Sequence, residues 1–396
     1  MTRSVLISDG EQRSALAAVR SLGQSGYRVY VCSKNGRSIA GASRYALAER
    51  AVSSALDNPS RFAQEVRALI TDWKINVLLP MTEETFNALF AHPELFADVC
   101  IPSATAEQFR AVSDKKRVLE VAASCGLNVP AQVVLSAAGD ADRLFDTGLR
   151  FPLVVKPARS VAQLGGKQLK LGVIHCGDTK ALRRALATLP SAAYPLLLQQ
   201  RVIGAGVGVF LLLWDGDLVA TFAHRRLRER PPAGGVSVYR ESIAAEHELV
   251  QNSRLLLDSF GWRGVAMIEY KLDETTGTPY IMEINGRFWG SLQLAIDAGV
   301  DFPSLLVARA CGERVFGPSV YKLGIRSRWE WGGVDYVLAR LRRSDTELSL
   351  PPGSPGRIRG VLSALVPWMP GDRLEVFRFA DPAPFFRETA QYFRRS

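Results

Sequence analysis

The sequence has few cysteines and no long apolar segment. Its five cysteines are scattered, odd in number and without a Cys-x-x-Cys pair, which fits a reducing cytosol better than a disulfide framework. The longest apolar runs, such as VGVFLLLW, are much too short to span a bilayer. The N-terminus MTRSVLISDGEQR reaches acidic residues within a few positions, unlike a secretory signal. We therefore predict a cytoplasmic protein without a transmembrane segment.

Acidic residues are fewer than basic ones, 39 against 49, so the formal net charge is +10. This excess indicates anionic partners such as nucleotides or acidic substrates. No helix-turn-helix, zinc or RNA-recognition pattern accompanies it, so we predict no nucleic-acid binding. No Gly-x-Gly-x-x-Gly follows the first predicted strand either, which gives a dinucleotide site little support.

The first hundred residues do contain a regular pattern, in which strand-like and helix-like segments alternate. SVLISD, YRVYVCS and KINVLLPM are strand-like, and RSALAAVRSLGQSG and PSRFAQEVRALITDW are helix-like. Such alternation is typical of βαβ units on a parallel sheet. We therefore predict a Rossmann-like domain at the N-terminus of an α/β protein.

Two later segments, GVAMIEYKL (264–272) and PYIMEIN (279–285), flank the turn-rich DETTGT and predict a β-hairpin. Side chains alternate between the faces of a strand. One face of the hairpin is then apolar and the other polar. The apolar face would carry Ile268, Tyr270, Leu272, Tyr280, Met282 and Ile284, and the polar face Glu269, Lys271, Glu283 and Asn285.

In this register Glu269 lies directly opposite Glu283, where like charges repel. A cation between them would relieve the repulsion, and carboxylate and amide oxygens suit Mg²⁺ with substrate phosphates as its other ligands. The alternative is a solvated face on which Glu283 pairs with Arg287.

Two lysines stand at positions where a cation is costly without an anion. Lys156 ends the apolar strand FPLVVKP, and Lys115 follows the candidate helix caps Ser113 and Asp114, against the helix dipole. Phosphate binding explains both positions. The alternative for Lys156 is a side chain that extends to the surface.

The order of these segments resembles the ATP-grasp superfamily, whose members include biotin carboxylase and D-alanine ligase. The resemblance rests on SDKK with GLNVP, PLVVKP, LLLQQRVIG, MIEYK and YIMEINGRFWGS, and it covers residues 1 to about 315. Glu-x-Asn-x-Arg with an acidic residue on the preceding strand is its most specific element. FAHRRLRERPPAGGVSVYRES and the segment after residue 282 are similar to the carboxylate-amine ligase-like branch.

The resemblance implies an ATP-grasp fold with a pre-ATP-grasp domain over residues 1–106 and an ATP-grasp domain over 107–315, with a lid at about 128–198. Residues 316–396 would be a C-terminal extension. It also implies roles for the motif residues. These are the phosphate ligands Lys115 and Lys156, the adenine hinge Gln199, Gln200, Arg201 and Val202, the metal ligands Glu269, Glu283 and Asn285, and Arg287 facing the transferring phosphoryl group.

The implied reaction joins a small carboxylate to an amine through an acyl phosphate and releases ADP and phosphate. Two Mg²⁺ ions would be bound, for which Mn²⁺ could substitute, and Glu283 would bridge them. Two alternatives are ATP-dependent carboxylation through carboxyphosphate and nucleotide binding without turnover. A homodimer is compatible with the sequence.

The chain departs from the ATP-grasp pattern in two places. SVAQLGGKQLKLG predicts a hairpin turning at Gly165 and Gly166, where many relatives have a glycine-rich phosphate loop. Lys167 and Lys170 could still contact phosphates. The segment after the hinge, GAGVGVF, also lacks the carboxylate that several relatives place on the ribose.

The run AHRRLRER places His224, Arg226 and Arg228 on one face if it is a strand. We predict that Arg226 and Arg228 bind an anionic substrate or phosphates, with PPAGGVS as a loop over the site. The alternatives are a solvated basic strand and a structural histidine.

The C-terminal extension has an unusual composition, because its apolar and aromatic residues are mixed with arginines. We predict a cap that packs Trp329, Trp331 and Trp368 against the catalytic core. A peripheral membrane anchor at anionic lipid is the alternative.

Overall fold

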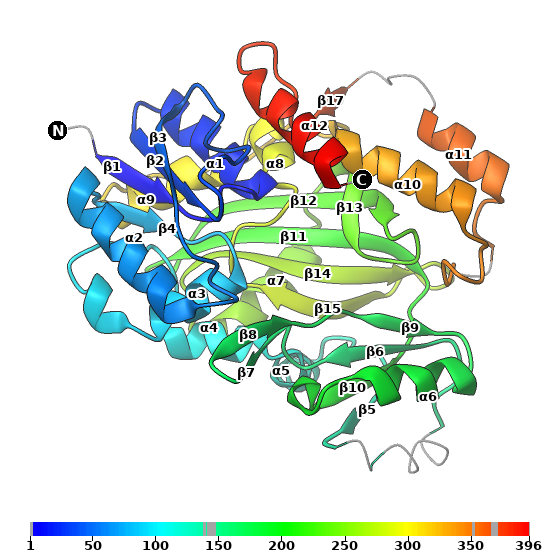
Figure 1. The fold of residues 1–396 in the computed structure, drawn as a ribbon. Coiled ribbons are helices and arrows are strands. Elements are labelled where there is room, and N and C mark those ends of the chain that lie inside the picture. The colour runs from blue at the N-terminus through cyan, green and yellow to red at the C-terminus, as the bar shows by residue number, and fades with distance from the viewer. Residues whose placement is uncertain (1–2, 138–139, 141–147, 351–352, 366–370, 396) are drawn as a thin grey trace.

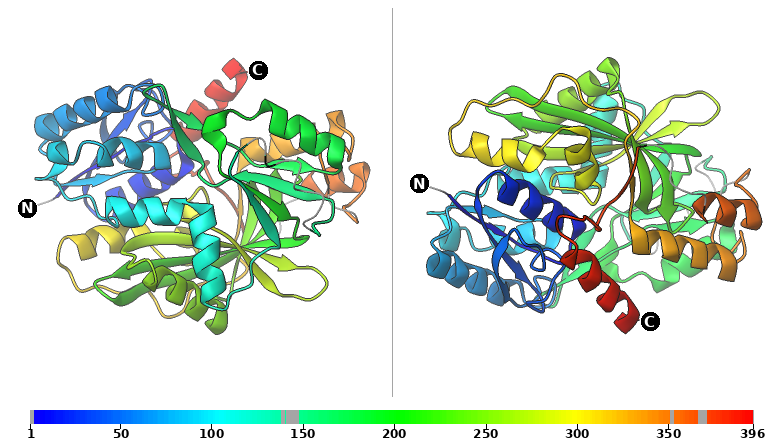
Figure 2. Two further views of the ribbon diagram at one scale, coloured as in Figure 1. Left: turned by 90° about the horizontal axis from the view of Figure 1, so that it is seen from below. Right: turned by 90° about the horizontal axis from the view of Figure 1, so that it is seen from above.

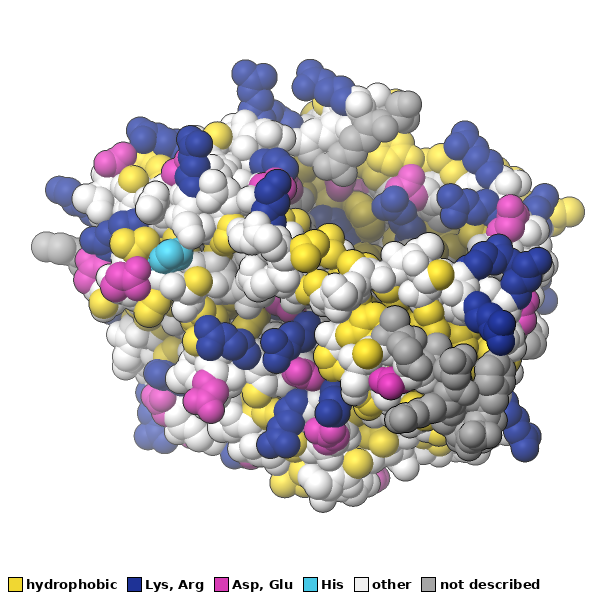
Figure 3. Space-filling model, turned by 60° about the horizontal axis from the view of Figure 1, so that its bottom comes forward, with side chains coloured by type: hydrophobic (Ala, Val, Ile, Leu, Met, Phe, Trp, Pro, Cys, Tyr) yellow, Lys and Arg dark blue, Asp and Glu magenta, His cyan; other side chains and the backbone are white. Residues whose placement is uncertain are grey.

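The computed structural model describes residues 3–137, 140, 148–350, 353–365 and 371–395. Four sheets, one of them the two-stranded β7–β8 hairpin, and the helices between them form one body, with the largest sheet at its centre (Figures 1 and 2). In these residues no helix is both long and apolar enough to cross a membrane. Figure 3 shows basic side chains spread over one face of the molecule, with acidic side chains among them.

The N-terminal part is a parallel sheet of order β3-β2-β1-β4, as the alternating pattern predicts. Val5 and Ile7 of β1 face α1, while Leu6 between them faces α2. Both faces are therefore covered, which explains the continuous apolar strands. The elements are β1 (Ser4–Ile7), α1 (Arg13–Gln24), β2 (Arg28–Ser33), β3 (Ala46–Ala51), α2 (Pro59–Trp73), β4 (Val77–Leu79), α3 (Glu83–Phe90), η1 (Pro93–Phe96) and α4 (Ala106–Ser113).

A smaller antiparallel sheet of order β5-β10-β6-β9 lies in the segment predicted as a lid, with α6 against it. The predicted hairpin at Gly165 and Gly166 is confirmed as β7–β8, and both glycines have the positive φ values that a tight two-residue turn requires. The elements are α5 (Lys115–Ser124), β5 (Gln132–Leu135), β6 (Leu153–Pro157), β7 (Val161–Leu164), β8 (Lys167–Lys170), β9 (Ile174–Cys176), α6 (Thr179–Thr188), η3 (Ser191–Ala193) and β10 (Leu196–Gln200).

The central sheet has seven strands in the order β15-β14-β11-β12-β13-β16-β17 and is covered on both faces. Along β11, Val209 and Leu211 face α4, α5 and α7, whereas Phe210 and Leu212 face α1, α8 and α9. Its elements are β11 (Gly204–Trp214), β12 (Asp217–Arg230), β13 (Val236–Ile243), α7 (His247–Asp258), β14 (Gly264–Asp273), β15 (Pro279–Asn285), α8 (Leu292–Ala298) and α9 (Phe302–Ala310).

The C-terminal extension adds β16 (Arg326–Arg328) and β17 (Asp372–Leu374) to the edge of this sheet. Helices α10 (Glu330–Arg342) and α11 (Arg357–Leu365) lie between these strands in the chain, and α12 (Ala383–Arg395) follows them and lies beside the N-terminal domain (Figures 1 and 2). The extension is therefore integrated into the fold.

The predicted packing of the tryptophans is partly found. Trp329 lies under the guanidinium of Arg13, 3.9 Å from ring centre to Cζ, whereas Trp331 stacks on Tyr392 within the extension. Trp368 lies outside the described residues.

Candidate active site

A cavity of about 410 Å³ lies between the lid sheet and the polar face of the central sheet. The β12–β13 turn also lines it, at the place where the sequence predicts a loop over the site. All of the predicted site residues line it except Lys115 and Arg228. The predicted residues at the cavity are Lys156, Gln199, Gln200, Arg201, Val202, Arg226, Glu269, Glu283, Asn285 and Arg287.

The predicted hairpin is confirmed as β14–β15, and Glu269 lies opposite Glu283 as its register requires. One part of the predicted face pattern is wrong. A β-bulge follows this pair, so that Ile281 pairs with Tyr270 and packs in the core, while Met282 lines the cavity. The bulge adds one residue to β15 and shifts the alternation beyond it. As a result, an apolar side chain enters the cavity beside the carboxylates.

Glu283 is held as a carboxylate by the groups around it. Lys115 Nζ lies 3.5 Å from its Oε2, and Asn285 Nδ2 donates to its Oε1 at 3.0 Å. Burial works to raise the pKa of Glu283, but Lys115, the hydrogen bond from Asn285 and the more distant Lys156 outweigh it and lower the pKa to about 2. Lys115 thus belongs to the site through Glu283, although it does not line the cavity.

Arg226 neutralises the second carboxylate. Both of its terminal nitrogens bond to Glu269, one of them at 2.8 Å, and the same guanidinium bonds to Glu229 at 2.8 Å. Burial nevertheless raises the pKa of Glu269. Arg226 opposes this shift, and the nearby charge of Glu283 adds to it. Lys271 lies 3.4 Å from Glu229. The predicted metal ligand Glu269 and the predicted substrate ligand Arg226 are therefore partners of each other in this structure.

Arg228 does not share the face of Arg226, contrary to the prediction. Register shifts between β12 and β13 fall on either side of Arg228, so the alternation of the strand is interrupted. Its guanidinium instead bonds to the backbone carbonyl of Ser363 and lies 4.9 Å from the Tyr239 ring. Arg228 thus joins β12 to the C-terminal extension.

Lys156 is half-buried at the cavity and has no ion-pair partner among the described residues. Its Nζ lies 3.7 Å from Met282 Sδ. Burial lowers its pKa to about 8, although Glu283 and Glu269 oppose the shift. An anion beside this lysine would favour its charged form and raise its pKa toward the ordinary value.

The predicted adenine hinge lies at the end of β10. Gln199 is buried and its Nε2 donates to Gln132 Oε1 at 2.7 Å. The Arg201 amide donates to the carbonyl of Pro152, and its side chain bonds to the carbonyls of Ser349 and Ala233 at 2.7 and 2.9 Å. Arg201 therefore fastens the hinge to the β12–β13 turn and to the C-terminal extension.

Comparisons with known proteins agree with this arrangement. Residues 193–330 match a family described as "ATP-grasp in the biosynthetic pathway with Ter operon". Among solved structures, the chain is similar to an L-amino acid ligase from Bacillus licheniformis, with 17% identity, a TM-score of 0.60 and coverage of 78% of this chain and 74% of that chain. The chain has the ATP-grasp fold. The resemblance predicted from the sequence, and with it the α/β class, is confirmed.

Two further ATP-grasp neighbours were solved with nucleotides. A biotin carboxylase from Campylobacter jejuni in complex with β-γ-ATP is 16% identical, with a TM-score of 0.64 and coverage of 82% of this chain and 74% of that chain. An N5-carboxyaminoimidazole synthetase from Staphylococcus aureus complexed with ADP is 16% identical, with a TM-score of 0.63 and 82% of each chain covered. A search of curated protein sequences finds no significant match.

The donor set at the ATP-grasp cavity fits Mg²⁺. Glu269 and Glu283 face each other, and the Asn285 amide lies beside Glu283. Among the described residues no group of three or more His, Cys, Asp and Glu could hold a metal by itself. Mg²⁺ commonly binds one or two carboxylates and takes phosphate oxygens and waters for the rest. Arg226 does not prevent Glu269 from binding a metal ion, because a carboxylate has about four lone-pair sites and the two hydrogen bonds from the guanidinium use two of them.

The β7–β8 hairpin, which the sequence predicts in place of a phosphate loop, is fastened to the N-terminal domain. Gln168 Nε2 donates to the carbonyls of Ala55 and Glu84, both at 2.9 Å, and Asn87 donates to Gln168 Oε1 at 3.3 Å. Lys170, a candidate phosphate ligand, lies 3.2 Å from the Glu84 carboxylate. The hairpin therefore bridges the lid and the N-terminal domain.

Sequence reasoning missed several residues at the cavity. Glu229, which forms an ion pair with Lys271 of the predicted polar face, could have been noticed as the single acid within a basic run. His175 has no such signal. Its Nδ1 is buried without a hydrogen-bond partner in the described part of the chain, and burial lowers its pKa to about 4. His224 is buried, and its Nδ1 lies 3.3 Å from Ser291 Oγ, which supports the structural alternative.

Proposed function

We propose that this protein is an ATP-dependent ligase that joins a carboxylate to an amine. The observation that carries the proposal is the opposition of Glu269 and Glu283 at a cavity that also holds Lys156, Asn285 and Arg287. Phosphoryl transfer needs positioning and neutralisation of charge more than covalent help from the protein. This cavity supplies both.

In the proposed reaction each side chain has a limited task. Lys156 holds phosphate oxygens, Lys115 keeps Glu283 ionised, and Arg287 faces the transferring phosphoryl group. Glu269, Glu283 and Asn285 would hold Mg²⁺, which neutralises phosphate charge when bound. Met282, beside Lys156, offers an apolar contact to the base.

The bonds formed and broken balance without a redox partner. An oxygen of the substrate carboxylate attacks the γ-phosphorus, and the bond to the β-phosphate oxygen breaks to release ADP. The amine nitrogen then attacks the acyl carbon, loses a proton and expels inorganic phosphate. The ligase named among the structural neighbours supports this choice, and the carboxylase and synthetase support ATP-dependent chemistry more generally.

The test is ADP release measured over paired pools of acids and amines, followed by mass spectrometry of the products. We expect release that requires one acid and one amine and yields their condensation product. Release that needs bicarbonate but no organic acid would indicate carboxylation instead. ATP binding without release in any pool would indicate a nucleotide-binding protein without turnover.

A further inference from the structure

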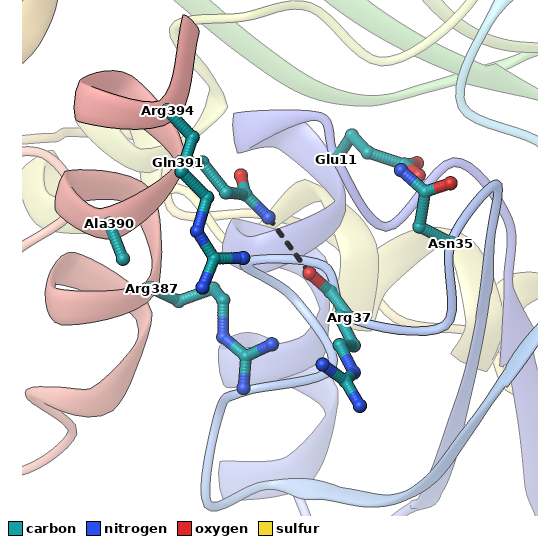
Figure 4. A pocket seen from close by; sticks show the side chains of 7 residues that line it. All are labelled: Glu11, Asn35, Arg37, Arg387, Ala390, Gln391 and Arg394. Carbon is teal, nitrogen blue, oxygen red and sulfur yellow. Dashed lines mark hydrogen bonds between the residues drawn. The ribbon is translucent and has the colours of Figure 1, made fainter.

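A second cavity, of about 620 Å³, lies between the N-terminal domain and α12. We call it the α12 cavity. One wall is the loop after β1 and the loop after β2, and the other is one side of α12 (Figure 4). Its lining residues are Glu11, Asn35, Arg37, Arg387, Ala390, Gln391 and Arg394. It shares no lining residue with the candidate active site.

Three arginines give this cavity its chemical character. Figure 4 shows Arg387 and Arg394 extending from α12 toward the loop that carries Arg37. In the described part of the chain none of the three forms an ion pair, whereas Arg13, Arg20 and Arg226 are each paired with a carboxylate. Guanidinium groups that face one cavity repel unless an anion lies between them.

Among the described lining residues, the one carboxylate already has a partner. Glu11 Oε1 accepts a hydrogen bond from the Lys34 amide at 2.7 Å, so it helps to fix the loop after β2. Figure 4 shows Glu11 and Asn35 on the side of the cavity away from α12. They place a carboxylate acceptor and an amide opposite the basic wall that α12 forms.

The walls are held at a fixed spacing. Gln391 Nε2 donates to the backbone carbonyl of Arg37 at 2.8 Å, so α12 is tied directly to the loop after β2. On the other side of α12, Trp329 Nε1 donates to Glu388 at 2.9 Å and Trp331 Nε1 to Thr389 at 3.0 Å. The arginines thus project from a docked helix.

The cavity also lies at the carboxyl ends of two parallel strands. Strands β1 and β2 are parallel, and the two loops that line the cavity follow their carboxyl ends. Its volume is in the range of small-molecule sites. A ligand there would meet backbone and polar groups at one end and guanidinium groups at the other.

We propose that the α12 cavity binds a soluble small molecule through a phosphate or pyrophosphate group. Guanidinium groups match phosphate oxygens with paired hydrogen bonds, and three of them around one cavity suit an anion with more than one negative charge. Asn35 and Glu11 would contact the uncharged part of the ligand. This site is separate from the proposed nucleotide site and does not depend on it.

The test is calorimetric titration of the full-length protein with inorganic pyrophosphate at constant ionic strength. The variant Arg387→Gln with Arg394→Gln removes two of the three cations. The matched control, Arg184→Gln with Arg359→Gln, removes two exposed arginines elsewhere. We expect one binding event of the wild type to weaken at least about tenfold in the first variant, because charge-assisted hydrogen bonds are lost, and to persist in the control.

Three results would overturn the proposal. The first is the absence of any pyrophosphate binding, and the second is binding that the two variants weaken equally, which would indicate general surface charge. The third concerns lipid, because Phe386 and Phe393 of α12 are exposed beside the arginines. The wild type would then sediment with vesicles of phosphatidylcholine and phosphatidylserine, the first variant would not, and soluble pyrophosphate would not bind. These results together would assign α12 to a membrane surface.

Discussion

The candidate active site, here called the nucleotide cavity after its proposed ligand, and the α12 cavity both contain arginines, but they differ in what neutralises them. Arg226 in the nucleotide cavity is buried and bonds to Glu269 and Glu229. Arg37, Arg387 and Arg394 stand at an open cavity without such partners among the described residues. A buried charge without a partner destabilises the fold, whereas an accessible charge is solvated by water until a ligand binds. The difference predicts that changes at the first cavity affect catalysis or folding, and that changes at the second affect binding alone.

The largest effect is expected at Glu283. Glu283→Gln keeps the volume but removes the charge that faces Lys115 and the proposed Mg²⁺. We expect ADP release to fall by at least about a hundredfold, because transition-state charge is less well stabilised. The control is Glu274→Gln, an exposed carboxylate in the turn of the same hairpin. Turnover within threefold of the wild type, in a folded protein, would exclude the metal role.

A large effect on stability is expected at Glu375 of the C-terminal extension. It is buried and paired with both Arg13, which lines the nucleotide cavity, and Arg240. Glu375→Gln leaves these cations without a counter-charge, so we expect about 3–5 kcal/mol less free energy of unfolding in denaturant titrations.

The ion pairs of Glu375 with Arg13 and Arg240 predict a pH dependence of stability whose direction can be tested. Burial opposes ionisation, but Arg13 and Arg240 outweigh it and lower the pKa of Glu375 below its ordinary value of 4.5. The stabilisation is therefore present above pH 4.5 and is lost as the pH falls through the lower folded-state pKa. The loss caused by Glu375→Gln should shrink in that range. A difference that does not change with pH would contradict the ion pair.

A moderate effect is expected from Lys156 as the pH changes. Its pKa of about 8 is below the ordinary 10.5, so above pH 8 it is increasingly uncharged before ATP binds. Glu283, Glu269, Lys115 and Lys271 are the charged groups that influence it. Because phosphate favours the charged form, ATP affinity should fall as the pH rises through 8, approaching roughly tenfold per unit.

Lys156→Arg is the control for this dependence, because arginine stays charged throughout. The variant should bind ATP with little change between pH 7 and 9.5 in equilibrium titrations. Equal slopes for wild type and variant would mean that another group titrates.

The smallest effect is expected from Arg387→Gln with Arg394→Gln on stability. These side chains make no ion pair in the described structure, so the change in free energy of unfolding should stay within about 0.5 kcal/mol. Thermal unfolding of this variant beside Glu375→Gln would measure the contrast directly. A loss as large as that of Glu375→Gln would show that the α12 arginines are structural.

The local periodicity of the sequence was sufficient for the strands and for the polar face of the hairpin. Alternation along β14 and β15 predicted that Glu269 faces Glu283, because two-residue periodicity fixes the face of each side chain. The same rule failed for Met282 and Arg228, since bulges shift the alternation and leave no distinct sequence signal. The order of the ATP-grasp motifs predicted the fold, which periodicity alone does not.

Contacts between distant segments were decided by the tertiary structure alone. Arg13 and Glu375, and Arg37 and Gln391, are each more than 350 residues apart in the chain, and no spacing rule connects them. The same holds for Gln168 of the lid hairpin, which bonds to Ala55 and Glu84 of the N-terminal domain. The sequence determined which side chains share a face of a strand, because that depends on neighbouring dihedral angles. The packing of the domains decided which charged side chains form ion pairs and which remain accessible to a ligand.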